Sequence, residues 1–117
     1  PIYAFTNPAH PFAARYTLQI RPLLEARCFS CHNPRRRGGP KGGLDLTTIE
    51  ALMKGGETGP VIIPGNAEES LLILAVTYED PFLQMPPLEE DRLSPNEIDI
   101  LRNWINSAKP KAPPIDP

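Results

Sequence analysis

Two cysteines and a histidine in one short stretch offer the clearest chemistry in this sequence. Cys28 and Cys31 are separated by two residues, and His32 follows the second thiol directly. Thiols at this spacing can reach the two vinyl groups of one haem and form thioether bonds, while the imidazole lies beneath the iron as its ligand. The stretch Cys28–His32 therefore predicts one covalent haem c, with His32 as the proximal ligand.

A second candidate iron ligand, Met85, is followed by Pro86 and Pro87. Pro86 disfavours helical angles at Met85, and Pro87 stiffens the next step. A methionine on such a braced loop can hold its thioether at a fixed point, as a weak, soft iron ligand requires. We expect Met85 to be the distal ligand; the alternative is that it only packs.

Two further side chains could bind iron but have plainer interpretations. His10 lies in a proline-containing N-terminal stretch, where a histidine is usually solvated, and it could reach the iron only if this stretch folded back. Met53 falls near the end of a short predicted helix, where a methionine more often fills core space.

Two helices are expected around the thiol stretch. The first runs from about Thr17 to Cys28 and delivers Cys28 to the haem edge, although Pro22 indicates an irregular or late start. The second is predicted from a capping box, with Thr47 at the cap and Glu50 three residues later, and it ends at Gly55-Gly56.

Two more helices are expected after residue 65. The third begins at Asn66, with Glu69 completing the cap, and runs through Val76. The fourth has Ser94 as its cap, continues to residue 109, and carries an apolar stripe that should bury against the first helix. The fold class is therefore all-α. Apolar side chains of these segments are expected to form the haem pocket: Phe29, Leu44, Leu46, Leu71, Leu74, Phe82 and Trp104.

The length of 117 residues and the composition indicate one small, loop-rich domain. The hydrophobic fraction is 40%, with 16 prolines and 8 glycines. A core this thin usually needs a staple, which a covalently held porphyrin would provide. We expect an extended arm or linker over 1–14, the folded domain over 15–109 and a linker-like tail over 110–117.

Charge is distributed unevenly along the chain. Residues 1–59 hold eight Lys and Arg against four Asp and Glu, whereas residues 60–117 hold four against ten. The difference could orient a charged redox partner, or it could have no spatial meaning.

The longest apolar run, 71–76, is far shorter than the roughly 20 residues of a membrane span, so no membrane span is predicted. The opening residues do not resemble a signal peptide. Haem attachment would nevertheless place the protein in the periplasm or another exported location.

A basic, glycine-rich loop follows the thiol stretch at 33–43. Nucleic-acid binding is excluded because the chain is acidic overall and no aromatic residues interleave with Arg35, Arg36 and Arg37. Contact with haem propionates and simple solvation both remain open. We expect a backbone carbonyl within residues 34–43 to accept a hydrogen bond from the Nδ1–H of His32.

Alternatives without haem have weaker support in the sequence. A thioredoxin-like dithiol requires a strand followed by a helix, whereas here a helix leads into the motif. Structural zinc requires four ligands, and the chain offers Cys28, Cys31, His32 and the distant His10.

The order of the motifs resembles the class I cytochrome c fold, and more closely the planctomycete-type cytochrome c domain. The resemblance covers about residues 18–108 and rests on these stretches: 20–24, 28–32, 43–46, 55–60, 64–72, 85–87, 93–97 and 104–105. It implies a haem c domain, often part of a larger exported protein, with the sixth ligand supplied by a late loop. One departure is Asn33, where many members carry glycine.

Three functions are consistent with this sequence. We expect one-electron transfer through a His32- and Met85-ligated iron, in a domain that is not itself an enzyme and serves a redox partner or a fused catalytic domain. The first alternative is a haem sensor or enzyme with a labile sixth position. The second is a periplasmic interaction module in which haem is mainly structural.

Overall fold

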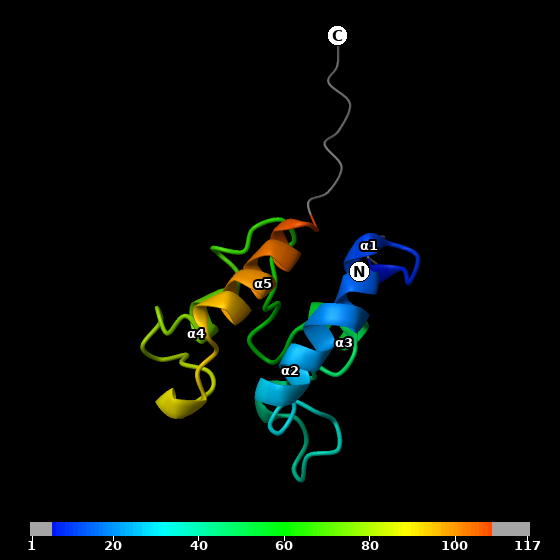
Figure 1. Ribbon diagram of the computed structural model, residues 1–117. Coiled ribbons are helices and arrows are strands. Elements are labelled where there is room, and N and C mark those ends of the chain that lie inside the picture. Colours follow the sequence, from blue (N-terminus) through cyan, green and yellow to red (C-terminus); the bar gives the residue numbers. More distant parts are fainter. Residues whose placement is uncertain (1–5, 109–117) are drawn as a thin grey trace.

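The computed structural model describes residues 6–108, and every regular element in this range is helical (Figure 1). No strand occurs among these residues, apart from an isolated bridge between Gly56 and Gly59. The predicted all-α class is therefore confirmed. The linker-like tail predicted for 110–117 lies outside the described residues.

The first helical segment begins at Pro11 rather than at the predicted Thr17. It comprises α1 (Pro11–Arg15), the π-helical turn η2 (Tyr16–Ile20) and α2 (Arg21–Arg27). His10 is the N-cap of α1, and its Nδ1 accepts a hydrogen bond from the backbone N–H of Phe12 at 3.1 Å. Residues 11–14 are thus helical rather than extended, because the histidine side chain and an N-terminal proline start the helix.

Pro22 lies inside this segment, which the π-helical turn makes possible. Proline removes a backbone donor and crowds the carbonyl four residues earlier. The preceding turn is wider, with the N–H of Arg21 donating to the carbonyl of Tyr16 five residues back. The irregularity predicted from Pro22 is therefore confirmed, but it interrupts the helix instead of delaying its start.

The second predicted helix is α3 (Ile49–Lys54), and its N-cap is Thr48 rather than Thr47. The Thr48 Oγ1 accepts a hydrogen bond from the N–H of Ala51 at 3.1 Å. Thr47 is held outside the helix, because its N–H and hydroxyl both donate to the Asp45 carboxylate. The helix ends at Gly55, whose φ of 82° is readily adopted by glycine, as predicted.

The third helix, α4 (Leu71–Val76), begins later than the predicted Asn66. Asn66 and Glu69 do make reciprocal contacts, but these close a single turn. Ser70 then has extended backbone angles, and its buried hydroxyl donates to the carbonyl of Asn66 at 2.8 Å and accepts from the N–H of Ile63 at 2.9 Å. These bonds give the backbone a local alternative to continuing the helix.

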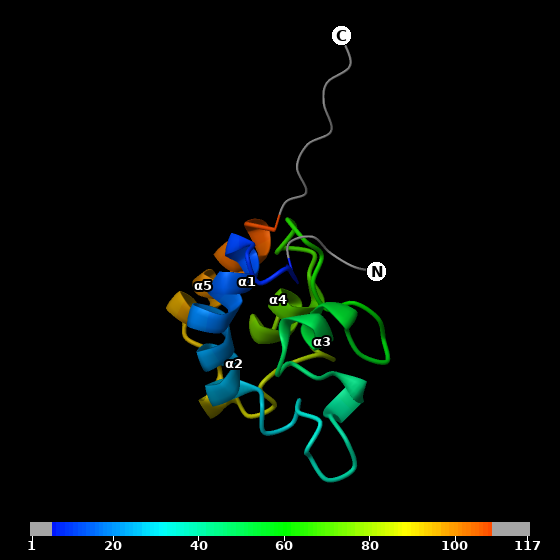
Figure 2. The same cartoon turned by 90° about the vertical axis from the view of Figure 1, so that its right-hand side faces the viewer.

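The fourth helix, α5 (Pro95–Asn106), has the predicted capping box. The Ser94 hydroxyl accepts from the N–H of Glu97, and the Glu97 carboxylate accepts from the N–H of Ser94. The helix ends at Asn106, before the predicted stop at residue 109, which lies outside the described range. Figure 2 shows α5 beside the N-terminal helical segment.

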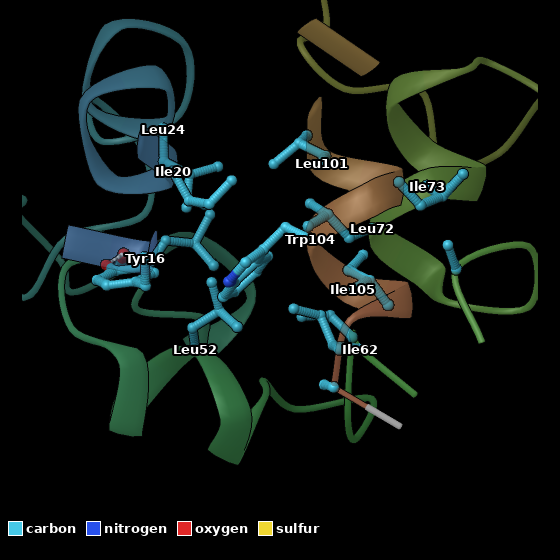
Figure 3. Close-up of a cluster of buried hydrophobic side chains, with 14 of the residues drawn as sticks. Tyr16, Ile20, Leu24, Leu52, Ile62, Leu72, Ile73, Leu101, Trp104 and Ile105 are labelled. Carbon is cyan, nitrogen blue, oxygen red and sulfur yellow. Dashed lines mark hydrogen bonds between the residues drawn. The ribbon is translucent and has the colours of Figure 1, made fainter. Parts of the chain in front are cut away.

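Trp104 joins the first and last helices of the domain (Figure 3). Its ring stacks on Phe12 with the centroids 4.2 Å apart, and its indole N–H donates to the carbonyl of Phe12 at 3.0 Å. Both side chains are almost completely buried, among Tyr16, Ile20, Leu24 and Leu101. The predicted packing of α5 against the first helix is confirmed.

We expect Trp104→Ala to lower the free energy of unfolding of the haem-loaded protein by about 3–5 kcal/mol, because it leaves a cavity and an unpaired carbonyl in the core. Leu18→Ala is the control. Leu18 lies in the same helical segment but is 80% exposed, so this change should cost less than about 0.5 kcal/mol. Denaturant unfolding measures both; equal losses would contradict this account of the core.

Candidate functional site

The thiol stretch forms a tight turn at the C-terminal end of α2. The N–H of Cys28 donates to the carbonyl of Leu24 at 2.7 Å, which continues the last turn of the helix. The N–H of His32 then donates to the carbonyl of Cys28 at 3.0 Å. Cys28, Cys31 and His32 are all half-buried, so the turn presents them together.

The imidazole of His32 is oriented by a backbone carbonyl. Its Nδ1 lies 3.1 Å from the carbonyl oxygen of Leu44, one residue beyond the loop in which we expected the acceptor. Burial is the largest influence on the pKa of His32 and lowers it, although the Leu44 contact opposes this shift. With Nδ1–H donating to Leu44, the neutral ring keeps the lone pair on Nε2 for a metal.

Asn33 closes the turn on the other side of His32. Its side-chain amide donates to the carbonyl of Phe29, and its Oδ1 accepts from the N–H of Arg35 at 2.8 Å. Asn33, at which the sequence departs from the pattern it resembles, therefore has a structural role here. Beyond it, the N–H of Lys41 donates to the carbonyl of Cys31 at 2.8 Å, which folds the basic loop back onto the thiol stretch.

Met85 is held beside α4 by its own backbone. Its N–H donates to the carbonyl of Ala75 at 3.1 Å, and its side chain is half-buried. The Met85–Pro86 peptide bond is cis, and the carbonyl of Pro86 accepts a hydrogen bond from the Tyr78 hydroxyl. The loops that carry His32 and Met85 lie toward the same end of the molecule in both ribbon views.

Two neighbouring cavities bring these predicted ligands together. Their volumes are about 350 and 330 Å³, and Cys28, His32, Lys41 and Met85 line both of them. Volumes of this size are typical of small-molecule and cofactor sites. His32 and Met85, which are more than fifty positions apart in the sequence, thus border the same two cavities.

The two cavities differ in their other walls. Around the first are Cys31, Arg27, Asp91 and the segment from Pro86 to Leu88. Around the second is a mostly apolar wall, in which three predicted pocket residues, Leu44, Leu46 and Leu71, occur together with Val61, Leu72, Ala75, Val76 and Leu83.

Four predicted pocket residues do not line either cavity. Trp104 belongs to the core between the helices, and Phe82 is 95% exposed. Phe29 packs at the edge of the core, with the Arg21 guanidinium 5.4 Å from its ring centre. Leu74 is half-buried on α4, away from both linings.

The face of α4 that lines the cavity could not be distinguished in the sequence. All six residues of α4 are apolar, so the run has no polar side to mark its orientation. The helix begins at Leu71, and the residues that face the cavity are Leu71, Leu72, Ala75 and Val76, one stripe of a helical wheel. Leu74 falls outside that stripe.

The cysteine environment argues against a redox-active dithiol. Burial raises the pKa of the Cys28 thiol to about 11, whereas reactive cysteines need a lowered pKa. For zinc, no group of three or more His, Cys, Asp or Glu side chains within residues 6–108 is arranged to hold a metal ion. His10 is engaged at the start of α1.

The comparison with protein families agrees with this site. A family model described as planctomycete cytochrome C matches residues 28–89, from the first thiol to just beyond Met85. Fold and site thus define a c-type cytochrome domain, and the chain belongs to the planctomycete cytochrome C family. No curated protein and no solved structure matched the chain. Within residues 6–108, no helix has the length and hydrophobicity needed to cross a bilayer.

Haem is the group that the family implies, and the residues present fit it. Two thiols border the first cavity at the sequence spacing of haem attachment, and the half-buried imidazole of His32 is oriented through its Nδ1. An apolar wall suits the porphyrin face, and Met85 adds a thioether. The basic residues at the cavities are Lys41 and Arg27, while Arg35, Arg36 and Arg37 are exposed.

Gly56 forms part of the apolar wall at a point where no side chain fits. A Cβ there would lie 2.7 Å from the carbonyl oxygen of Gly42 and 3.2 Å from the Cβ of Leu44. We expect Gly56→Ala to displace this wall and to lower the free energy of unfolding of the haem-loaded protein by about 1–3 kcal/mol.

Thr58→Ala is the matched control for this prediction. Thr58 lies in the same turn and is exposed, so its truncation should cost less than about 0.5 kcal/mol. Denaturant unfolding compares the two variants, and a Gly56→Ala protein as stable as the control would contradict the close approach.

Proposed function

We propose that this domain transfers single electrons through one haem c whose iron is bound by His32 and Met85. The observation that carries the proposal is that His32, Met85 and Cys28 border the same two cavities, although Met85 comes from a separate loop. An imidazole and a thioether that border the same cavities are the pair of iron ligands found in electron-carrying c-type cytochromes.

Each residue would have a separate task at this site. Cys28 and Cys31 would anchor the porphyrin at the end of α2, so that it cannot dissociate. His32 would bind the iron through Nε2, and the Leu44 carbonyl would fix the ring and increase its basicity. Met85 would supply a second iron ligand from its proline-braced loop.

The haem supplies a reversible one-electron change at iron when it is bound. The chain would keep the structural change that accompanies electron transfer small. With His32 and Met85 both engaged, the coordination would stay the same in both redox states, and the apolar wall of α4 would exclude water. A thioether ligand favours the reduced state and therefore raises the potential relative to two imidazoles.

The remaining expectations concern where the domain acts. C-type haem is attached outside the cytoplasm, so we propose a periplasmic or otherwise exported location, in keeping with the family. A redox partner protein or a fused catalytic domain would supply or accept the electron. The propionate contact expected from the 33–43 loop remains a prediction, and Lys41 of that loop lines both cavities.

The covalent attachment of haem is tested by denaturing the protein and recording its optical spectrum. We expect the protein, made in a host that matures c-type cytochromes, to keep its haem after denaturation, with a pyridine haemochrome spectrum of two thioether links. Cys28→Ala and Cys31→Ala should each shift that spectrum to one link. Haem lost completely from the unfolded wild-type chain would contradict the assignment.

Ligation by Met85 is tested against the chain's other described methionine, Met53. We expect the wild-type reduced protein to bind carbon monoxide poorly, because Met85 occupies the sixth position. Met85→Leu should open that position and bind carbon monoxide rapidly and stoichiometrically.

Met53→Leu is the matched control, because Met53 is buried in the core and not at the cavities. This volume-conserving change should leave carbon monoxide binding as in the wild type. Rapid, stoichiometric binding by the wild-type protein would instead favour a sensor or enzyme with a labile sixth ligand.

A further inference from the structure

The loop that carries Met85 is tied together by two residues outside the cavity linings, Tyr78 and Arg92. The Tyr78 hydroxyl donates to the carbonyl of Pro86, the residue directly after Met85. The Arg92 guanidinium donates to the carbonyl of Thr77 at 3.2 Å and lies 4.2 Å from the centre of the Tyr78 ring. Arg92 therefore joins the two ends of the loop, and Tyr78 joins its start to its middle.

Tyr78 has a backbone conformation that tyrosine rarely adopts. Its φ is 63°, in the left-handed region, and it is the non-glycine residue with positive φ among residues 6–108. Such a conformation persists where the surroundings hold it in place. Here the holding contacts are the Pro86 carbonyl on the hydroxyl and Arg92 on the ring.

Two large apolar side chains of the loop are exposed. Phe82 is 95% exposed and Leu88 is 57% exposed, so neither packs firmly against the core. Between them Met85 is bound to α4 through its N–H and the carbonyl of Ala75. The bond from the Tyr78 hydroxyl to the carbonyl of Pro86 therefore restrains the backbone that follows Met85.

We propose that Tyr78 and Arg92 are positioning residues that hold the Met85 loop at the cavity and so keep the Met85 thioether on the iron. This rests on the proposed function, in which Met85 is the distal ligand. The Tyr78 hydroxyl fixes the peptide after Met85, while Arg92 fixes the Tyr78 ring by a cation–π contact and anchors itself to the end of α4.

The test is Tyr78→Phe in the haem-loaded protein, because this change removes the hydroxyl and keeps the ring for Arg92. We expect the methionine-to-iron band of the oxidised protein to weaken and the midpoint potential to fall. The Met85 amide should exchange its hydrogen about two- to tenfold faster, the range of one lost hydrogen bond. Arg92→Met should change all three in the same direction.

Thr48→Ala is the control. The Thr48 hydroxyl accepts a hydrogen bond from the backbone N–H of Ala51 at 3.1 Å at the start of α3, and neither residue lines the cavities. Losing this hydroxyl should lower stability while leaving the band, the potential and the Met85 exchange rate as in the wild type. A similar loss of the band in both variants would show a general structural effect and overturn the proposal.

Failure of the proposed function gives a different result from failure of this inference. A wild-type protein without the methionine-to-iron band would refute Met85 ligation, and with it the role of Tyr78 in ligation. A wild-type band that stays unchanged in Tyr78→Phe, with unchanged potential and Met85 exchange, would refute the positioning role while leaving Met85 as the ligand.

Discussion

The stacked pair of Phe12 and Trp104 is the interaction on which the geometry of this domain depends. It fixes the start of the N-terminal helical segment against α5, through a ring stack and an indole hydrogen bond in a dry core. That segment leads directly into Cys28, and α5 directly follows the loop that carries Met85. Because these two helical segments cannot shift easily, the loop of Cys28 starts at a fixed place and the loop of Met85 ends at one.

Within that frame, the site is assembled by backbone hydrogen bonds of the loops themselves. His32 is oriented by the Leu44 carbonyl, and Met85 is bound to α4 through the Ala75 carbonyl. The haem would add a large apolar body to a domain that is rich in proline and glycine.

Local structure was predictable from the sequence where it depends on residues that are close together in the chain. The helical class, the Ser94 capping box and the end of α3 at Gly55 are confirmed. The start at Pro11 was not predicted, because it depends on a histidine cap and on burial of Phe12 against a residue 92 positions away. Trp104 is hydrophobic, as its predicted place in the haem pocket required. Hydrophobicity alone, however, does not distinguish a residue of the protein core from one that lines a cofactor pocket.

The most direct test of the account is the X-ray absorption of iron in the oxidised and reduced protein. The thioether sulfurs of Cys28 and Cys31 bind the porphyrin and not the metal, so sulfur bonded to iron must come from a methionine. We predict one such sulfur in both redox states, and its loss in Met85→Leu but not in Met53→Leu. Iron bonded to nitrogen alone, or to nitrogen and oxygen, would contradict it.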